Sequence, residues 1–172
     1  MKKERLLIYD ESELEYDPAT GEIFSDPKIL YSTTRVNAHK NHLLHMGVLV
    51  IPEHQGRYAM KVRGDGKSYP GYLDFLAEHP IDEEDPWSAA VRGLSEETGH
   101  TKGALGQMVM MRINDGSSEN LIVPVFHFNS HERYDDWKFF LSGEIDEMIT
   151  AGVDITPWTT QAFKLAMMKG LL

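Results

Sequence analysis

The stretch 78–100, EHPIDEEDPWSAAVRGLSEETGH, decides the fold because it carries the start and stop signals of a helix. Asp85 is a residue type that caps helix N-termini, and Pro86 suits the first helical position. Gly99 suits the left-handed position just past a helix end. The pattern therefore predicts a helix between Pro86 and Gly99. Its apolar residues at helical spacing are expected to bury one face against a sheet; they are Trp87, Ala90, Val91 and Leu94.

Apolar segments on both sides of this helix predict strands. The run 43–51, LLHMGVLVI, is almost continuously apolar, which is typical of a strand buried on both faces at the centre of a sheet. Further strands are expected at 57–62, 72–77, 107–113 and 120–128, and helices at 144–152 and 156–172. Thr156 and Pro157 give the last helix its N-terminal signal. This order predicts an α/β fold, an α/β/α sandwich with a mixed central sheet.

The N-terminal part is predicted to form an extension of that sandwich. Short strands at 5–9 and 28–32 flank the polar turn DPATGE, so residues 1–40 are expected to form a flap. At 172 residues and 19.6 kDa, with 41% hydrophobic residues, the chain suits a single domain over 1–172.

Charge and composition exclude several classes of function. The net charge of -10 opposes binding of a nucleic acid polymer, whereas a small phosphorylated metabolite with divalent cations is compatible with an acidic pocket. The absence of cysteine excludes disulfides, thiolate metal sites and a cysteine nucleophile. The apolar run LLIY ends at Asp10, too short for a signal peptide, and no run approaches the roughly 20 apolar residues of a membrane span. A soluble, cytoplasmic protein is the expectation.

The charged residues of the stretch 78–100 resemble a Nudix box, G-x5-E-x7-R-E-U-x-E-E-x-G-U, where U is a bulky apolar residue. Six of nine defined positions match, namely Glu84, Arg92, Leu94, Glu96, Glu97 and Gly99. The three departures are Glu78, Gly93 and His100. The resemblance implies a Nudix fold and a hydrolase of phosphoric anhydrides that uses Mg²⁺ or Mn²⁺. It also implies that Glu96 and Glu97 bind the metal, while Glu84 and Arg92 shape the loop and the helix.

A simpler interpretation of the glutamates is that they are solvated charges on a surface helix, with Arg92 as an ion-pair partner. The fixed spacing to Glu84 and Gly99 favours the family resemblance instead. Gly93 stands where the family usually has a glutamate that helps to hold a metal. Glu78 either returns a carboxylate to the same neighbourhood or is a solvent-facing loop residue.

From about His39 to the C-terminus the chain also resembles isopentenyl diphosphate isomerases, which are Nudix-fold enzymes. The resemblance rests on the order of AHKNHLLHMGVLV, an Arg63 and Lys67 pair before YPG, the HP of EHP, ENLIVPVF and DITPW. It implies that His79 and Glu119 bind metal, together with Glu97 of the box. His39 and His45 approach two further ligand positions at a spacing one residue too short. For His39, His42 and His45 a polar loop is the preferred interpretation.

The resemblance also assigns the catalytic positions of those isomerases. Their cysteine corresponds to Ala77 and their glutamate to Leu121, and neither side chain here transfers protons. The chain is therefore expected to be a relative of the isomerases without their activity. Arg63 and Lys67 match residues that contact diphosphate, although surface solvation explains them equally well. Trp158 and Phe163 match a lid over the substrate, but core packing is preferred for both.

The leading hypothesis is a metal-dependent hydrolase of a small diphosphate-containing metabolite. Its catalytic residues are expected to be Glu97, Glu96, Arg92 and Glu84, its substrate-binding residues Arg63 and Lys67, and its metal ligands Glu96, Glu97, Glu119 and His79. The alternative is a Nudix-fold module that binds a phosphorylated ligand or a protein partner without turnover. An isomerase-like enzyme is a weaker alternative. A homodimer is compatible with the sequence, as are several classes of diphosphate substrate.

Overall fold

The apolar run 43–51 lies at the centre of the sheet, as expected, but Gly47 divides it into two strands, β3 (His45–Met46) and β4 (Val48–His54). The computed structural model describes residues 4–116 and 119–172. Strand β4 pairs in parallel with β9 (Asn120–Ser130) and antiparallel with β5 (Arg57–Val62) and β7 (Leu76–Glu78). The first five residues of β4 are buried, which agrees with a strand covered on both faces.

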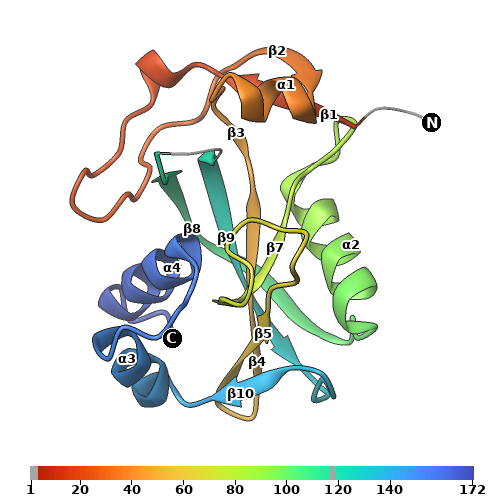
Figure 1. Cartoon of the computed structure of the whole chain (residues 1–172), viewed down its shortest axis with the longest axis vertical. Coiled ribbons are helices and arrows are strands. Elements are labelled where there is room, and N and C mark those ends of the chain that lie inside the picture. The colour runs from red at the N-terminus through yellow and green to blue at the C-terminus, as the bar shows by residue number, and fades with distance from the viewer. Residues whose placement is uncertain (1–3, 117–118) are drawn as a thin grey trace.

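The remaining strands extend this centre into one mixed sheet. Its order is β10-β5-β4-β9-β3-β1-β2, while β6 pairs with β5, β7 with β4 and β8 with β9 (Figure 1). The other strands are β1 (Arg5–Tyr9), β2 (Ile29–Thr34), β6 (Leu73–Asp74), β8 (Gly103–Asn114) and β10 (Lys138–Phe140). The helices are α1 (Arg35–Lys40), α2 (Pro86–Thr98), α3 (Ser142–Thr150) and α4 (Pro157–Met168), with a short 3-10 turn at Glu11–Glu13.

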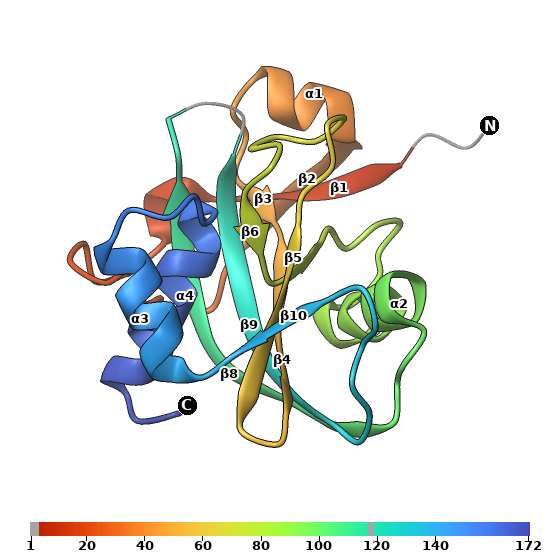
Figure 2. The ribbon, with the colours of Figure 1, turned by 60° about the horizontal axis from the view of Figure 1, so that its bottom comes forward.

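Helices cover both faces of the sheet, so the predicted α/β/α sandwich is confirmed. Helix α2 lies on one face, and α3 and α4 lie on the other (Figures 1 and 2). Alternate residues of β4 face the two layers. Val48 and Val50 pack in the cluster that contains Leu94 of α2, whereas Leu49 and Ile51 pack in the cluster with Trp158, Phe163 and Ile145 of the other two helices.

Helix α2 begins and ends where the sequence predicted. The Asp85 side chain accepts a hydrogen bond from the Ser88 amide at 2.8 Å, Pro86 is the first helical residue, and Gly99 has φ 71°. The expected buried face was partly wrong. The buried positions are Ala89, Ala90, Gly93 and Leu94, while Trp87 and Val91 are 49% and 38% exposed. The small residues let the helix approach the sheet closely, and Trp87 packs at its rim, edge-on to Phe126.

The N-terminal segment joins the sheet edge. Strands β1 and β2 pair antiparallel, and Ile8 of β1 pairs with His45 of β3. Helix α1 was not predicted from the sequence; the Thr34 side chain caps it by accepting a hydrogen bond from the Asn37 amide. The expected strand 72–77 is two short strands, β6 and β7, and β10 was also missed. Across the described ranges, none of the helices has the length and apolar character needed to span a bilayer.

Candidate active site

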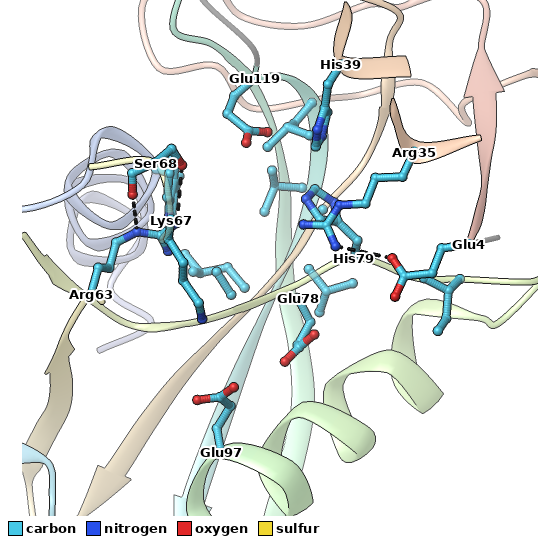
Figure 3. Close-up of a pocket in the computed structure, with 18 of the residues that line it drawn as sticks. Glu4, Arg35, His39, Arg63, Lys67, Ser68, Glu78, His79, Glu97 and Glu119 are labelled. Atoms are coloured by element: carbon cyan, nitrogen blue, oxygen red, sulfur yellow. Dashed lines mark hydrogen bonds and ion pairs between the residues drawn. The ribbon is translucent and has the colours of Figure 1, made fainter. Parts of the chain in front are cut away.

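A pocket of about 530 Å³ opens between helix α1, helix α2 and the loop that follows β5 (Figure 3). Most of its polar lining falls into three groups: His39, His79 and Glu119 at one end, Glu96 and Glu97 at the other with Glu78 between them, and the cations Arg35, Arg63, Lys67 and Arg92. Glu4 and Ser68 complete the polar lining. Gly47, Val48, Leu49, Ala77, Leu121 and Val123 add a largely apolar part to its lining. The arrangement suits an anionic group beside a less polar one.

The first end of the pocket adjoins a cluster of four possible metal ligands, three of which line it. One ligand atom each from His39, His45, His79 and Glu119 lies within 4.8 Å of the other three. Helix α1 supplies His39 and strand β3 supplies His45; His79 follows β7, and Glu119 precedes β9. The interpretation of His39 and His45 as part of a polar loop was therefore wrong. His42 fits it better, since it is exposed and lies outside the cluster.

Hydrogen bonds hold two of the imidazoles in the tautomer whose Nε2 atom is free to bind a metal. Nδ1 of His45 lies 2.8 Å from the Leu43 carbonyl, and Nδ1 of His79 lies 3.2 Å from the Met46 carbonyl. Because a carbonyl only accepts, both rings carry their proton on Nδ1 and keep a lone pair on Nε2. Burial lowers the pKa of His45 to about 4 and that of His79 to about 3, so both are neutral near pH 7.

The fourth member of the cluster completes a donor set that fits a divalent cation. Glu119 is 8% exposed, and its Oε2 atom is buried without a hydrogen-bond partner in the described part of the chain. A buried carboxylate oxygen without a partner is costly. Nε2 of His39 also lies only 3.2 Å from Nε2 of His45. Three imidazole nitrogens and one carboxylate are ligands that Zn²⁺, Mn²⁺ and Fe²⁺ accept.

Arg92 organises the other end of the pocket. From helix α2 its guanidinium donates to Glu84 at 3.0 and 3.1 Å, to Glu78 at 3.2 Å, to Glu96 at 3.4 Å and to the His79 carbonyl at 2.8 Å. The hydrogen bonds to Glu84 are the main reason that the pKa of Arg92 lies above its usual value. Arg92 thereby ties the loop between β7 and α2, including the backbone at His79, to the helix.

The box glutamates lie apart from the histidine cluster. Glu97 pairs with Lys61 at 3.7 Å, and Glu96 pairs with Arg92; their side chains are 34% and 58% exposed. Both line the pocket, but neither belongs to the four-ligand group. The four sequence-predicted metal ligands are thus divided between two places, with His79 and Glu119 in the cluster and Glu96 and Glu97 on helix α2.

Glu78 is not a solvent-facing loop residue. It ends strand β7, its side chain is 16% exposed, and its carboxylate lies between the histidine cluster and Glu97 (Figure 3). Burial raises the pKa of Glu78, and the nearby charges of Glu97 and Glu96 raise it further, while Arg92 opposes the shift. Glu78 therefore brings a carboxylate close to Gly93, the position where the Nudix box usually has a glutamate.

The cations on the pocket wall differ in how firmly they are held. Arg63 bonds to Asp74 and to Ser68, and its guanidinium lies 5.1 Å from the Trp158 ring centroid. Lys67 extends into the pocket from the same loop (Figure 3). Arg35, on helix α1, was missed from the sequence because its place beside the pocket depends on how the N-terminal segment folds back; it pairs with Glu4 at 3.2 Å.

Two further sequence expectations concern apolar residues. Ala77 and Leu121 both line the pocket, so no acid or base stands at either position. Trp158 and Phe163 are 5% and 1% exposed and pack in the core, as preferred from the sequence. Trp158 also contributes to the pocket wall.

Solved structures of other proteins share this fold. No protein-family model and no curated protein matches the sequence. DR0079 from Deinococcus radiodurans superposes with a TM-score of 0.69 at 14% identity, covering 93% of this chain and 97% of that one. The MutT protein from Methanosarcina mazei Go1 gives 0.53 at 15% identity, covering 70% and 89% of the two chains. The E. coli dihydroneopterin triphosphate pyrophosphohydrolase gives 0.53 at 16%, covering 70% and 92%. The chain therefore has the fold of Nudix hydrolases.

Proposed function

We propose that this protein is a metal-dependent Nudix-type hydrolase of a small molecule that contains a diphosphate. The observation that carries the proposal is the pocket itself. It has three members of the four-ligand cluster, His39, His79 and Glu119, at one end, the glutamates of α2 at the other, and Arg35, Arg63 and Lys67 along its walls. Cations and metal ligands that converge on one cavity suit a phosphorylated anion.

His39, His45, His79 and Glu119 would hold one divalent cation. Imidazole ligands favour Mn²⁺ or a later transition metal over Mg²⁺, whereas Mg²⁺ prefers oxygen ligands such as those of Glu96 and Glu97. When bound, such a metal supplies Lewis-acid polarisation of phosphoryl oxygens and lowers the pKa of water. The resemblance to isopentenyl diphosphate isomerases agrees with the histidine ligands, and the resemblance to the Nudix box agrees with the glutamates.

The other residues of the pocket have separate tasks in this proposal. Arg63 and Lys67 bind phosphate oxygens, with Arg35 as a third cation from the N-terminal segment. Arg92 and Glu84 keep the loop before α2 in place, so that His79 and Glu78 face the cavity. The apolar lining around Val48 and Leu121 accommodates part of the organic moiety and limits access of bulk water.

Release of product from a panel of diphosphate compounds tests the proposal, followed by phosphorus NMR so that phosphate, pyrophosphate and the phosphate monoesters formed from nucleotide sugars and dinucleotides are all detected. The panel includes nucleoside triphosphates, nucleotide sugars, dinucleotides and prenyl diphosphates, each with Mg²⁺ and with Mn²⁺. We expect release by the wild type and a loss of at least about tenfold in Glu97→Gln. Glu147→Gln, on the exposed side of α3, is the matched control and is expected to behave as wild type. Turnover that is unchanged in Glu97→Gln would refute the role of Glu97.

A binding module without turnover is the second candidate, and Gly93 is the observation that favours it. The helix carries no carboxylate at this position of the box, and the acid and base positions of the isomerases are Ala77 and Leu121. For such a module the same panel gives no release, while its members still raise the melting temperature. That outcome would favour the binding module over the hydrolase.

A further inference from the structure

Asp74 lies buried beside the pocket and accepts four side-chain hydrogen bonds. It is 4% exposed. Its Oδ1 atom accepts from Thr156 Oγ1 at 2.9 Å, Trp158 Nε1 at 2.8 Å and Thr159 Oγ1 at 2.7 Å. Its Oδ2 atom accepts from Arg63 Nη1 at 2.5 Å. Because a buried carboxylate is costly unless it is paired and hydrogen-bonded, this set of donors explains how Asp74 is tolerated in the interior.

These bonds join two parts of the fold that are distant in the sequence. Thr156, Trp158 and Thr159 come from the start of helix α4, whereas Arg63 directly follows strand β5. The two oxygens of Asp74 accept from different partners: Oδ1 accepts only from residues at the start of α4, and Oδ2 accepts only from Arg63. Asp74 therefore connects a rigid element of the core to a cation of the pocket wall.

Three residues hold the Arg63 side chain in place: Asp74, Ser68 and Trp158. Besides its bond to Asp74, its Nε donates to the Ser68 carbonyl at 2.7 Å and its Nη2 to Ser68 Oγ at 3.2 Å. Its guanidinium also lies over the Trp158 ring. A guanidinium has five N–H groups, so two of them are left without an acceptor among the described residues. Arg63 lines the pocket, and its side chain is 13% exposed.

We propose that Asp74 is a positioning residue that fixes Arg63 as a two-pronged donor for phosphate oxygens of a diphosphate ligand. The proposal rests on the proposed function for the identity of the ligand. A fixed planar fork binds phosphate with defined geometry and loses less entropy than a free side chain. Lys67 acts differently, because it is a point charge on a flexible stem. Orientation of the ligand would thus depend on the Asp74 and Arg63 pair, while Lys67 adds attraction.

Binding of inorganic pyrophosphate, measured by calorimetry with and without Mn²⁺, tests the proposal without any need for turnover. Asp74→Asn keeps an oxygen for the donors of α4 but removes the charge that holds Arg63. We expect it to weaken pyrophosphate binding about tenfold, the scale of one charge-assisted hydrogen bond. Arg63→Lys is expected to weaken binding to a similar degree. Wild-type affinity in either folded variant would overturn the proposal.

The double variant separates positioning from general stability. If Asp74 acts through Arg63, Asp74→Asn adds no further loss of affinity in the Arg63→Lys background. Losses that multiply would overturn the proposal. Thr156→Val is the matched control: it removes a bond to Asp74 on the helix side only, so it should lower the melting temperature and leave the pyrophosphate Kd within about twofold. If Asp74→Asn does not fold, Asp74→Glu takes its place, because it keeps the charge but moves the carboxylate by one methylene; wild-type pyrophosphate affinity in that variant would overturn the proposal.

Failure of this proposal is distinguishable from failure of the proposed function. Pyrophosphate binding that depends on Asp74 and Arg63, in a protein that hydrolyses nothing in the panel, would sustain the positioning role and refute the hydrolase. Hydrolysis of a panel member with unchanged pyrophosphate affinity in Asp74→Asn would do the reverse. A wild type that binds no pyrophosphate with or without Mn²⁺ would overturn the positioning role.

Discussion

Gly93 of helix α2 and Glu78 of strand β7 share one space, because a Cβ atom built on Gly93 would lie only 2.5 Å from Glu78 Cγ. It would also lie 2.8 Å from Leu76 Cδ2. A side chain at position 93 and the present conformation of Glu78 therefore exclude each other. Two of the three departures from the Nudix box are therefore coupled: glycine in the helix leaves room for the glutamate that the strand provides.

This coupling predicts that Gly93→Ala destabilises the protein. Helix propensity alone would favour alanine by about 1 kcal/mol. Overpacking against Glu78 and Leu76 costs about 1–3 kcal/mol, so we expect a net loss of roughly 1 kcal/mol in the free energy of unfolding, measured with urea.

The control is the same Gly93→Ala substitution made in a protein that lacks the Glu78 side chain. In Glu78→Ala the clash with Cγ is gone, so Gly93→Ala should cost less there than in the wild type. Ser95→Ala, at an exposed site of the same helix, should change stability by only a few tenths of a kcal/mol. A Gly93→Ala protein more stable than wild type would show that the space at position 93 is not occupied.

Arg92→Lys is expected to destabilise the loop between β7 and α2. Lysine keeps the charge, but its compact ammonium cannot reproduce the two-point pair with Glu84 together with the bonds to Glu78 and the His79 carbonyl. Because the Arg92 side chain is only 25% exposed, we expect a loss of roughly 2 kcal/mol in the free energy of unfolding. Arg57→Lys is the matched control, since the exposed pair of Arg57 with Glu144 at 3.8 Å should contribute less than about 0.5 kcal/mol. Equal effects of both substitutions would contradict the central role of Arg92.

The histidine cluster predicts stabilisation by a transition metal. After dialysis against a chelator, addition of Mn²⁺ or Zn²⁺ should raise the melting temperature, since a ligand at 100 times its Kd stabilises by about 2.7 kcal/mol. His45→Ala removes a buried ligand of the cluster and should abolish most of that rise. His131→Ala, at an exposed site, should retain it. A wild-type melting temperature that neither metal changes would argue against the cluster as a metal site.

Local chemistry explains which elements the sequence could predict. Asp85, Pro86 and Gly99 define the ends of α2 through neighbouring backbone groups, so no distant contact was needed. The strand 57–62 was predicted to the residue for the same reason. The exposure of Trp87 was not predictable in this way. It depends on which side of the helix packs against the sheet, and Gly93 lies on that side, against Glu78 and Leu76.

The site was less predictable because its residues meet only in the folded chain. The resemblance pointed to His79 and Glu119, but the local spacing of His39 and His45 favoured a polar loop until α1 and β3 placed them together. Asp74 was overlooked, although a single charged residue within the apolar segment YLDFLA was a signal of a buried polar contact.

The residues at the two catalytic positions of the isomerases predict that this protein does not isomerise isopentenyl diphosphate. Ala77 pairs with Leu49 of β4, and Leu121 pairs with His45 of β3, so both positions flank the pocket beside the proposed metal ligands. A methyl and an isobutyl group can neither protonate an alkene nor remove a proton from the resulting carbocation.

We therefore expect no dimethylallyl diphosphate after incubation with isopentenyl diphosphate and Mg²⁺ or Mn²⁺, followed by proton NMR. The titratable groups nearest to these positions along the chain are Glu78 and His79, which follow Ala77, and Glu119, which lies two residues before Leu121. Product that forms in the wild type and disappears in Glu78→Gln would identify Glu78 as a replacement acid or base, and it would return the protein to the isomerases. Phosphate or pyrophosphate release without a change in the double bond would instead agree with hydrolysis, because that reaction breaks a bond to phosphorus or to the carbon that carries the diphosphate and leaves the alkene where it is.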